Sequence, residues 1–180
     1  NIIGCDITYN AFGNGAALRT WKGSPNLEHC WIAFNESDPW GNIHAEQSCL
    51  TLSNCYVAYN RATFGGGVFA DWSSSVSLFD CVFLSNEAEY GGGVDAYLAD
   101  LYMANCIVSG NSASEDGGGI RGYESQVIIS SCEISENSAT TGGGISLAHG
   151  AVSQVSNCTI HHNTAKVYGG GIYVSLTSPE

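Results

Sequence analysis

Basic residues and proline are the scarcest features of this 180-residue sequence. Five lysines and arginines stand against seventeen aspartates and glutamates, which gives a net charge of −12. Such a field repels a phosphate backbone or an anionic bilayer, so nucleic acid is excluded as a partner. Only three prolines occur, and charged residues make up 12% of the chain, about half the usual share of roughly 25%. Disordered chains need more charge and proline, so we expect an ordered fold.

Long apolar runs and a leader sequence are also absent. No run of about 18 apolar residues occurs, so we expect no transmembrane helix. The first residue is Asn1 rather than methionine, and no signal-peptide pattern follows it. We therefore expect residues 1–180 to form a single domain that is a segment of a longer chain.

The sequence is instead rich in a repeat of 25 or 26 residues. Each unit carries a cysteine, followed five residues later by an asparagine. Five units add an alanine, three glycines and a β-branched residue, as in Ala62, Gly65-Gly66-Gly67 and Val68. The seven pairs are Cys5 and Asn10, Cys30 and Asn35, Cys55 and Asn60, Cys81 and Asn86, Cys106 and Asn111, Cys132 and Asn137, and Cys158 and Asn163. A fixed period of this kind is typical of a solenoid.

Within each unit, apolar residues alternate with other residues. Val127 and Ile129 precede a cysteine in this way, and Ile145 and Leu147 follow a glycine triplet. A period of two predicts short, half-buried strands, and no stretch keeps a helical period long enough to form a helix. Three short strands per unit, repeated about seven times, predict an all-β parallel β-helix with one coil per unit. Coils about 4.8 Å apart would stack into a column of roughly 30 Å.

Stacking of the coils would place each residue on its counterpart in the next unit. The asparagines should form a ladder in which each side-chain amide donates to the next side-chain carbonyl. The glycines should allow neighbouring coils to approach closely at a corner. The column cysteines should be small buried residues with inert thiols, because parallel strands point their Cβ atoms the same way and give poor disulfide geometry. Cys49 lies outside the column, and we expect it to be exposed, as a reactive thiol or a lone bridge partner.

A candidate ligand-binding face follows from the residues that point outward after each glycine triplet. These positions should align as two columns across neighbouring coils. They include His44, Glu46, Phe69, Asp71, Asp95, Tyr97, Arg121 and Tyr123. Asp95 and Arg121 occupy equivalent positions in adjacent coils and are expected to pair, and Asp71 and Asp95 are expected to lie close enough to share a cation or a sugar. The alternative is a solvated face without a ligand, on which ion pairs contribute little.

Two reactions are compatible with these side chains. Two carboxylates at a suitable separation can hydrolyse a glycosidic bond. Clustered carboxylates can instead hold Ca²⁺ for lyase chemistry, with a nearby arginine as the base. The catalytic residues would then be Asp71, Asp95 and Arg121. No metal or other cofactor is expected unless these carboxylates hold Ca²⁺.

Two asparagines match the N-glycosylation sequon. They lie in Asn35-Glu36-Ser37 and Asn157-Cys158-Thr159. Asn35 belongs to the asparagine ladder and Asn157 precedes an inward cysteine, so we expect both to be too buried for modification.

The repeat resembles that of the chlamydial polymorphic outer membrane proteins, whose marks are FxxN and GGA[ILV]. Phe83-Leu84-Ser85-Asn86 matches the first mark, and other units carry valine or isoleucine in place of phenylalanine. Gly66-Gly67-Val68 and its counterparts match the second, with glycine in place of alanine. The similarity extends over nearly the whole chain. It implies a right-handed β-helix of the pectin-lyase-like superfamily, in secreted or surface-exposed segments that adhere or build structures, and it transfers no catalytic residue.

Two hypotheses for function follow. The first is a non-catalytic structural or adhesive segment of an extracellular, cell-surface or filament-forming protein. Its partners would be further coils or copies of the same protein, or surface glycans and proteins. The alternative is a polysaccharide-active lyase, hydrolase or epimerase, or a glycan-binding module, that uses the face after the glycine triplets. A deep groove over Asp71, Asp95 and Arg121, with a bound metal or sugar, would favour the enzyme, whereas a flat or partner-covered face would favour the scaffold.

Overall fold

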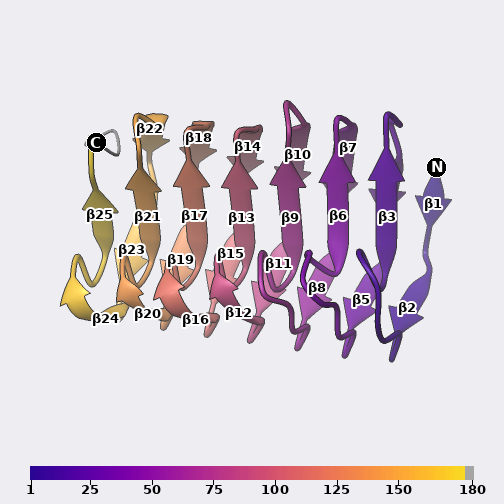
Figure 1. Ribbon diagram of the computed structural model, residues 1–180, viewed down its shortest axis with the longest axis horizontal. Helices are drawn as coiled ribbons and strands as arrows, with labels where there is room; N and C mark the ends of the chain where they lie inside the picture. Colours follow the sequence, from indigo (N-terminus) through magenta and orange to yellow (C-terminus); the bar gives the residue numbers. More distant parts are fainter. Residues whose placement is uncertain (177–180) are drawn as a thin grey trace.

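The computed structural model describes residues 1–176, whose strands wind into one column (Figure 1). These residues contain no helix, and hence none long and apolar enough to cross a membrane. Neighbouring strands are parallel and pair residues about one repeat apart, for example Val94 with Val68 and with Ile120. The predicted all-β parallel solenoid of about seven coils is therefore confirmed.

Three sheets run along the described column with one strand per coil. Sheet A consists of β1 (Ile2–Ile3), β4 (Asn26–Glu28), β7 (Cys49–Ser53), β10 (Ser75–Phe79), β14 (Asp100–Ala104), β18 (Gln126–Ser130) and β22 (Val152–Ser156). Sheet B consists of β2 (Asp6–Thr8), β5 (Trp31–Ala33), β8 (Tyr56–Ala58), β11 (Val82–Leu84), β15 (Ile107–Ser109), β19 (Glu133–Ser135) and β23 (Thr159–His161). Sheet D consists of β3 (Leu18–Trp21), β6 (Ile43–Glu46), β9 (Val68–Asp71), β13 (Val94–Tyr97), β17 (Ile120–Tyr123), β21 (Ile145–Ala148) and β25 (Ile172–Val174). These sheets supply the three strands per coil that the repeat predicts.

A fourth, shorter sheet adds a strand to the later coils. Sheet C consists of β12 (Glu87–Tyr90), β16 (Ser112–Asp116), β20 (Ser138–Thr141) and β24 (Thr164–Tyr168). Earlier coils form only single bridges at this place, such as Glu36 with Arg61. The second coil carries Pro39 here, and proline has no amide hydrogen to donate to a ladder.

Aliphatic side chains fill the interior of the column, because alternate residues of each strand point inward. Leu101, Val108 and Ile120 are examples, and all three are fully buried. The cysteine column lies in the same core without disulfides. Burial raises the pKa of Cys30, whereas the hydrogen bond with Cys81 lowers the pKa of Cys55 to about 6, so the inertness of the column thiols stays a prediction. Cys49 is exposed, as expected.

The asparagine ladder forms as predicted. The side-chain amide of Asn86 donates to Oδ1 of Asn111 at 2.9 Å and to the carbonyl oxygen of Val57 at 2.9 Å. The same Oδ1 accepts a second bond, from the backbone N–H of Asn86 at 2.9 Å. Repeated from coil to coil, these bonds satisfy the polar groups that the bend after sheet B would otherwise leave buried without partners.

The glycine triplets form the corner that leads into sheet D. The first glycine of each triplet has a positive φ, for example 69° at Gly117. The second permits a close approach, since a Cβ on Gly118 would lie 2.3 Å from the carbonyl oxygen of Gly143 in the next coil. Only glycine fits both positions without a shift of the backbone.

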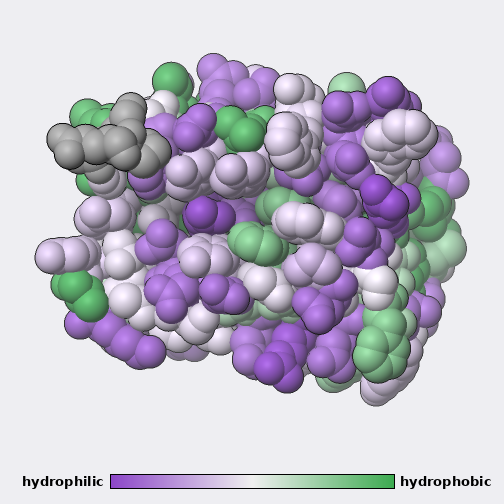
Figure 2. All heavy atoms as spheres, in the orientation of Figure 1, coloured by the Kyte–Doolittle hydropathy of each residue, from purple (hydrophilic) through white to green (hydrophobic). Residues whose placement is uncertain are grey.

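This regular corner aligns the outward residues of sheet D in two columns, as predicted. The first column runs through His44, Phe69, Asp95 and Arg121. The second runs through Glu46, Asp71, Tyr97 and Tyr123. The strands of sheet D lie nearest the viewer in Figure 1, so Figure 2 shows the same face as a surface.

Candidate functional site

An aromatic residue stands immediately before the glycine corner in three successive coils. These residues, Trp40, Phe64 and Tyr90, are named here the corner aromatics. Their rings stack, with centroids 5.3 Å apart between Trp40 and Phe64 and 5.4 Å apart between Phe64 and Tyr90. The sequence prediction did not include them, although an aromatic residue before three successive corners was a signal that could have found them.

A cleft of about 460 Å³ is formed by the corner aromatics and the outer face of sheet D. Its lining residues are Trp40, Phe64, Phe69, Asp71, Trp72, Tyr90, Tyr97, Arg121 and Tyr123. Trp72 directly follows β9 and is 58% exposed. Seven of the nine lining residues are aromatic. On this face, Figure 2 shows white and green side chains, of intermediate and high hydropathy, over the central coils.

The cleft brings together five of the eight predicted ligand-binding residues. They are Phe69, Asp71, Tyr97, Arg121 and Tyr123. The other three do not line it, but two of them, His44 and Asp95, contact residues that do.

The sequence predicts an open face, but the structure buries its central part. Asp95 has no exposed surface, Phe69 is 2% exposed and Asp71 is 3% exposed. The rings of Trp40 and Phe64 cover Phe69 at centroid distances of 5.4 and 5.7 Å. Asp95 is paired with Arg121, and Asp71 contacts His44. Strand periodicity identifies the outward residues, but it does not show that a neighbouring corner folds over them.

Asp95 of β13 and Arg121 of β17 pair, as predicted. Nη1 of Arg121 lies 3.3 Å from Oδ1 and 3.2 Å from Oδ2 of Asp95. The guanidinium carbon also lies over the rings of Tyr90 and Tyr123, at 4.6 and 5.0 Å from their centroids. Burial raises the pKa of Asp95 to about 6, although the charge of Arg121 counteracts this rise.

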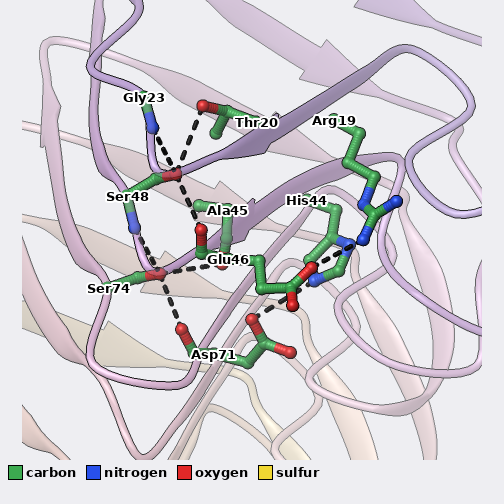
Figure 3. A network of polar contacts seen from close by, with 9 residues as sticks. All are labelled: Arg19, Thr20, Gly23, His44, Ala45, Glu46, Ser48, Asp71 and Ser74. Atoms are coloured by element: carbon green, nitrogen blue, oxygen red, sulfur yellow. Dashed lines mark hydrogen bonds and ion pairs between the residues drawn. The ribbon is translucent and has the colours of Figure 1, made fainter.

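A second buried contact joins His44 of β6 to Asp71 of β9. Nε2 of His44 lies 3.3 Å from Oδ1 of Asp71, and Figure 3 shows the other carboxylate oxygen pointing away from the histidine. Glu46 pairs separately with Arg19 at 2.6 Å. Asp71 and Asp95 therefore have different partners, and they belong to different columns of the face.

Only one of the two carboxylates in the catalytic hypothesis lines the cleft. Glycoside hydrolysis requires two carboxyl groups that both reach the scissile bond. Asp71 lines the cleft, whereas Asp95 is covered and accepts hydrogen bonds from Arg121. Within residues 1–176, no group of three or more histidines, cysteines, aspartates or glutamates is arranged to hold a metal ion.

The two sequon asparagines differ in exposure. Asn35 is 2% exposed, and its amide donates to Asn60 within the ladder, which agrees with the expected burial. Asn157 is exposed, so the expectation that it is buried was wrong. The physical reason is that Asn157 occupies a turn with a φ of 53° between β22 and β23, and not an inward strand position.

Comparison with known proteins gives a family match for the second half of the chain. A family model described as right handed beta helix region matches residues 89–180, which are 92 of the 180 residues. This description supplies the handedness that the repeat alone leaves open. Comparisons with curated proteins and with solved structures give no significant match.

Proposed function

Because the chain belongs to the right-handed β-helix family, we propose that it is a non-catalytic adhesive segment of an extracellular or cell-surface protein. Its function is to hold a glycan in the aromatic cleft. The observation that carries this proposal is the composition of the cleft, in which seven of nine lining residues are aromatic and the charged groups are confined to Asp71 and Arg121.

Aromatic walls suit a sugar because a pyranose ring presents C–H groups on its faces and hydroxyl groups at its rim. The faces can pack on the rings of Trp72 and Tyr97, which removes apolar area from water. The hydroxyl groups both donate and accept hydrogen bonds, so they match a site that offers a carboxylate and a guanidinium. A few polar groups in a mainly apolar wall are typical of small-ligand sites.

The covered position of Asp95 favours binding over catalysis. A lyase, hydrolase or epimerase that used Asp95 directly would need its carboxylate in contact with the substrate. The hydrogen bonds between Asp95 and Arg121 instead fix the arginine as part of the cleft wall. Binding of this kind requires no metal or other cofactor.

The remainder of the column supports the cleft. Its repeated asparagines, cysteines and glycines satisfy and pack the backbone, and these positions offer no group for chemistry. Further coils or copies of the same protein are the partners that we propose for the column itself, because like repeats stack on one another.

The proposal is tested by measuring the binding of the 180-residue chain to a panel of neutral and acidic glycans. Trp72→Ala should weaken the binding about fivefold or more, since loss of an aromatic anchor costs about 1 kcal/mol or more. The matched control is Trp21→Ala, because Trp21 is 62% exposed and does not line the cleft. An equal loss in both variants would place the glycan elsewhere, and release of reducing ends by the wild type would favour the enzyme.

A further inference from the structure

Negative charge surrounds the floor of the cleft. Asp71 lines it, and Asp95 lies beneath Arg121. Asp116, which is in register with Tyr90, is half-buried nearby. After burial, which is the largest cause, the charges of Asp116 and Asp71 raise the pKa of Asp95 further. Asp116 and Asp71 therefore both disfavour the charged form of Asp95.

Two glutamates extend this negative charge to the cleft wall. The pKa of Tyr90 is raised first by burial and then by the charges of Glu89 and Glu115. Glu89 precedes Tyr90 in the chain and Glu115 precedes Asp116, the register partner of Tyr90, so both lie near a ring that lines the cleft. Asp71 and Arg121 are the charged residues of the cleft lining, and Asp71 also contacts His44, which is charged only when protonated.

The positive charge of Arg121 is not available to an anionic ligand. Asp95 binds it through both carboxylate oxygens, and the rings of Tyr90 and Tyr123 cover the guanidinium. Arg121 is 6% exposed and Asp71 is 3% exposed, so the pairing of Arg121 with Asp95, and not its burial, distinguishes the two charges. A ligand in the cleft therefore meets only the Asp71 oxygen that points away from His44, next to an arginine that is already paired.

We propose that the cleft selects glycan units without a carboxyl group and excludes uronates. This inference rests on the proposed glycan binding and adds the class of sugar. The second oxygen of Asp71 can accept a hydrogen bond from a sugar hydroxyl. A uronate would instead bring its own carboxylate into a site that already carries a net negative charge, and like charges that meet in an interface cost several kcal/mol.

Asp95 is then the positioning residue that sets this selectivity, since it acts on the ligand through Arg121. Asp95→Asn keeps the size of the side chain but removes its charge. The guanidinium of Arg121 would lose its ion-pair partner, and the negative charge that a uronate meets at the cleft would fall by one. The variant should therefore lose discrimination against uronates rather than lose binding altogether.

The experiment uses matched pairs of oligosaccharides. Oligogalacturonate, oligoglucuronate and oligomannuronate are each compared with their carboxyl-reduced forms, which keep the same length and linkage. Binding of each probe is measured calorimetrically near pH 7.5. Wild-type protein should bind at least one carboxyl-reduced form about tenfold or more tightly than its uronate. Asp95→Asn should reduce this ratio, whereas Asp100→Asn, which removes an exposed carboxylate outside the cleft, should leave it unchanged.

The possible outcomes separate the selectivity against uronates from the glycan binding on which it rests. If wild-type protein binds a uronate as tightly as its reduced form, the selectivity is refuted while glycan binding stands. If no member of any pair binds, the proposed function itself fails, and the inference fails with it. Circular dichroism and urea unfolding of Asp95→Asn establish that the variant is folded. If the folded variant keeps the wild-type ratio of affinities for the carboxyl-reduced form and the uronate, Asp95 does not set the selectivity.

Discussion

Asn111 and Asp95 are both polar and fully buried, but burial affects them in opposite ways. The amide of Asn111 donates to Asn137 and to the carbonyl oxygen of Phe83, so no polar group loses its partner and no charge leaves water. The carboxylate of Asp95 pairs with Arg121, yet its pKa remains raised because the pair does not fully compensate the loss of hydration. The ladder therefore stabilises the fold, whereas burial of the ionised Asp95 carboxylate beside the cleft destabilises it.

The raised pKa of Asp95 predicts a specific pH dependence of stability. Its value in the folded protein, about 6, exceeds the ordinary value of 3.8, so protonation stabilises the fold. This contribution is fully present below the ordinary pKa and is lost as the pH rises through the folded-state pKa. Relative to Asp95→Asn, the wild type should gain about 2 kcal/mol of unfolding free energy between about pH 7 and about pH 4. Urea unfolding of both proteins at the two pH values measures this gain, and a constant difference would contradict it.

The two corners of sheet D are built from different residues. The corner before it consists of the glycine triplets, while the corner after it carries serines that were not predicted. Oγ of Ser48 accepts from the N–H of Gly23 at 3.2 Å and donates to the carbonyl oxygen of Glu46 at 2.8 Å, as Figure 3 shows. Ser74 repeats the carbonyl contact one coil later, to Ala45 and Asp71. Serine hydroxyl groups bond the backbone at the corner after sheet D, whereas close backbone contact between coils forms the corner before it.

The need for glycine at the corner can be tested at two equivalent positions. A Cβ on Gly119 would lie 2.7 Å from the carbonyl oxygen of Gly144, whereas a Cβ on Gly171 would meet its nearest atom at 3.6 Å. Neither residue has a positive φ. Gly119→Ala should therefore destabilise the fold by about 1–3 kcal/mol through overpacking, while Gly171→Ala should be neutral or slightly stabilising. Urea unfolding of both variants measures the contrast, and equal losses would show that contact between coils is not the cause.

On the scale of the whole molecule, the strands of each coil within residues 1–176 pair with those of the adjacent coils. Burial follows from this arrangement, because the central coils are covered on both sides. Asn111 and Val94 are fully buried, whereas Asn10 and Ile172 in the first and last described coils are exposed. Stability in such a column is approximately a sum of coil and interface terms.

Amide hydrogen exchange of the 180-residue chain should reveal this distribution. The amides of β13 and β17 should exchange most slowly, and those of β1, β2 and β25 should exchange earliest, because outer coils open with fewer lost contacts. Mass spectrometry of peptic fragments over time gives the order. Uniform protection along the column would instead mean that all coils open together.

The sequence by itself determined every feature that depends on a residue and its counterpart in the next coil. The asparagine ladder, the cysteine column and the pairing of Asp95 with Arg121 follow from the period, because a shift of one repeat places equivalent residues side by side. The two columns on sheet D follow in the same way.

Only the tertiary structure decided which outward residues are covered. The cleft requires Trp40 and Phe64, which belong to a corner, to lie over residues of sheet D. The exposure of Asn157 likewise depends on a turn conformation. The repeat fixes the spacing along the column, but the direction in which a side chain leaves a corner depends on the backbone angles there, and these angles are set by packing between different parts of one coil.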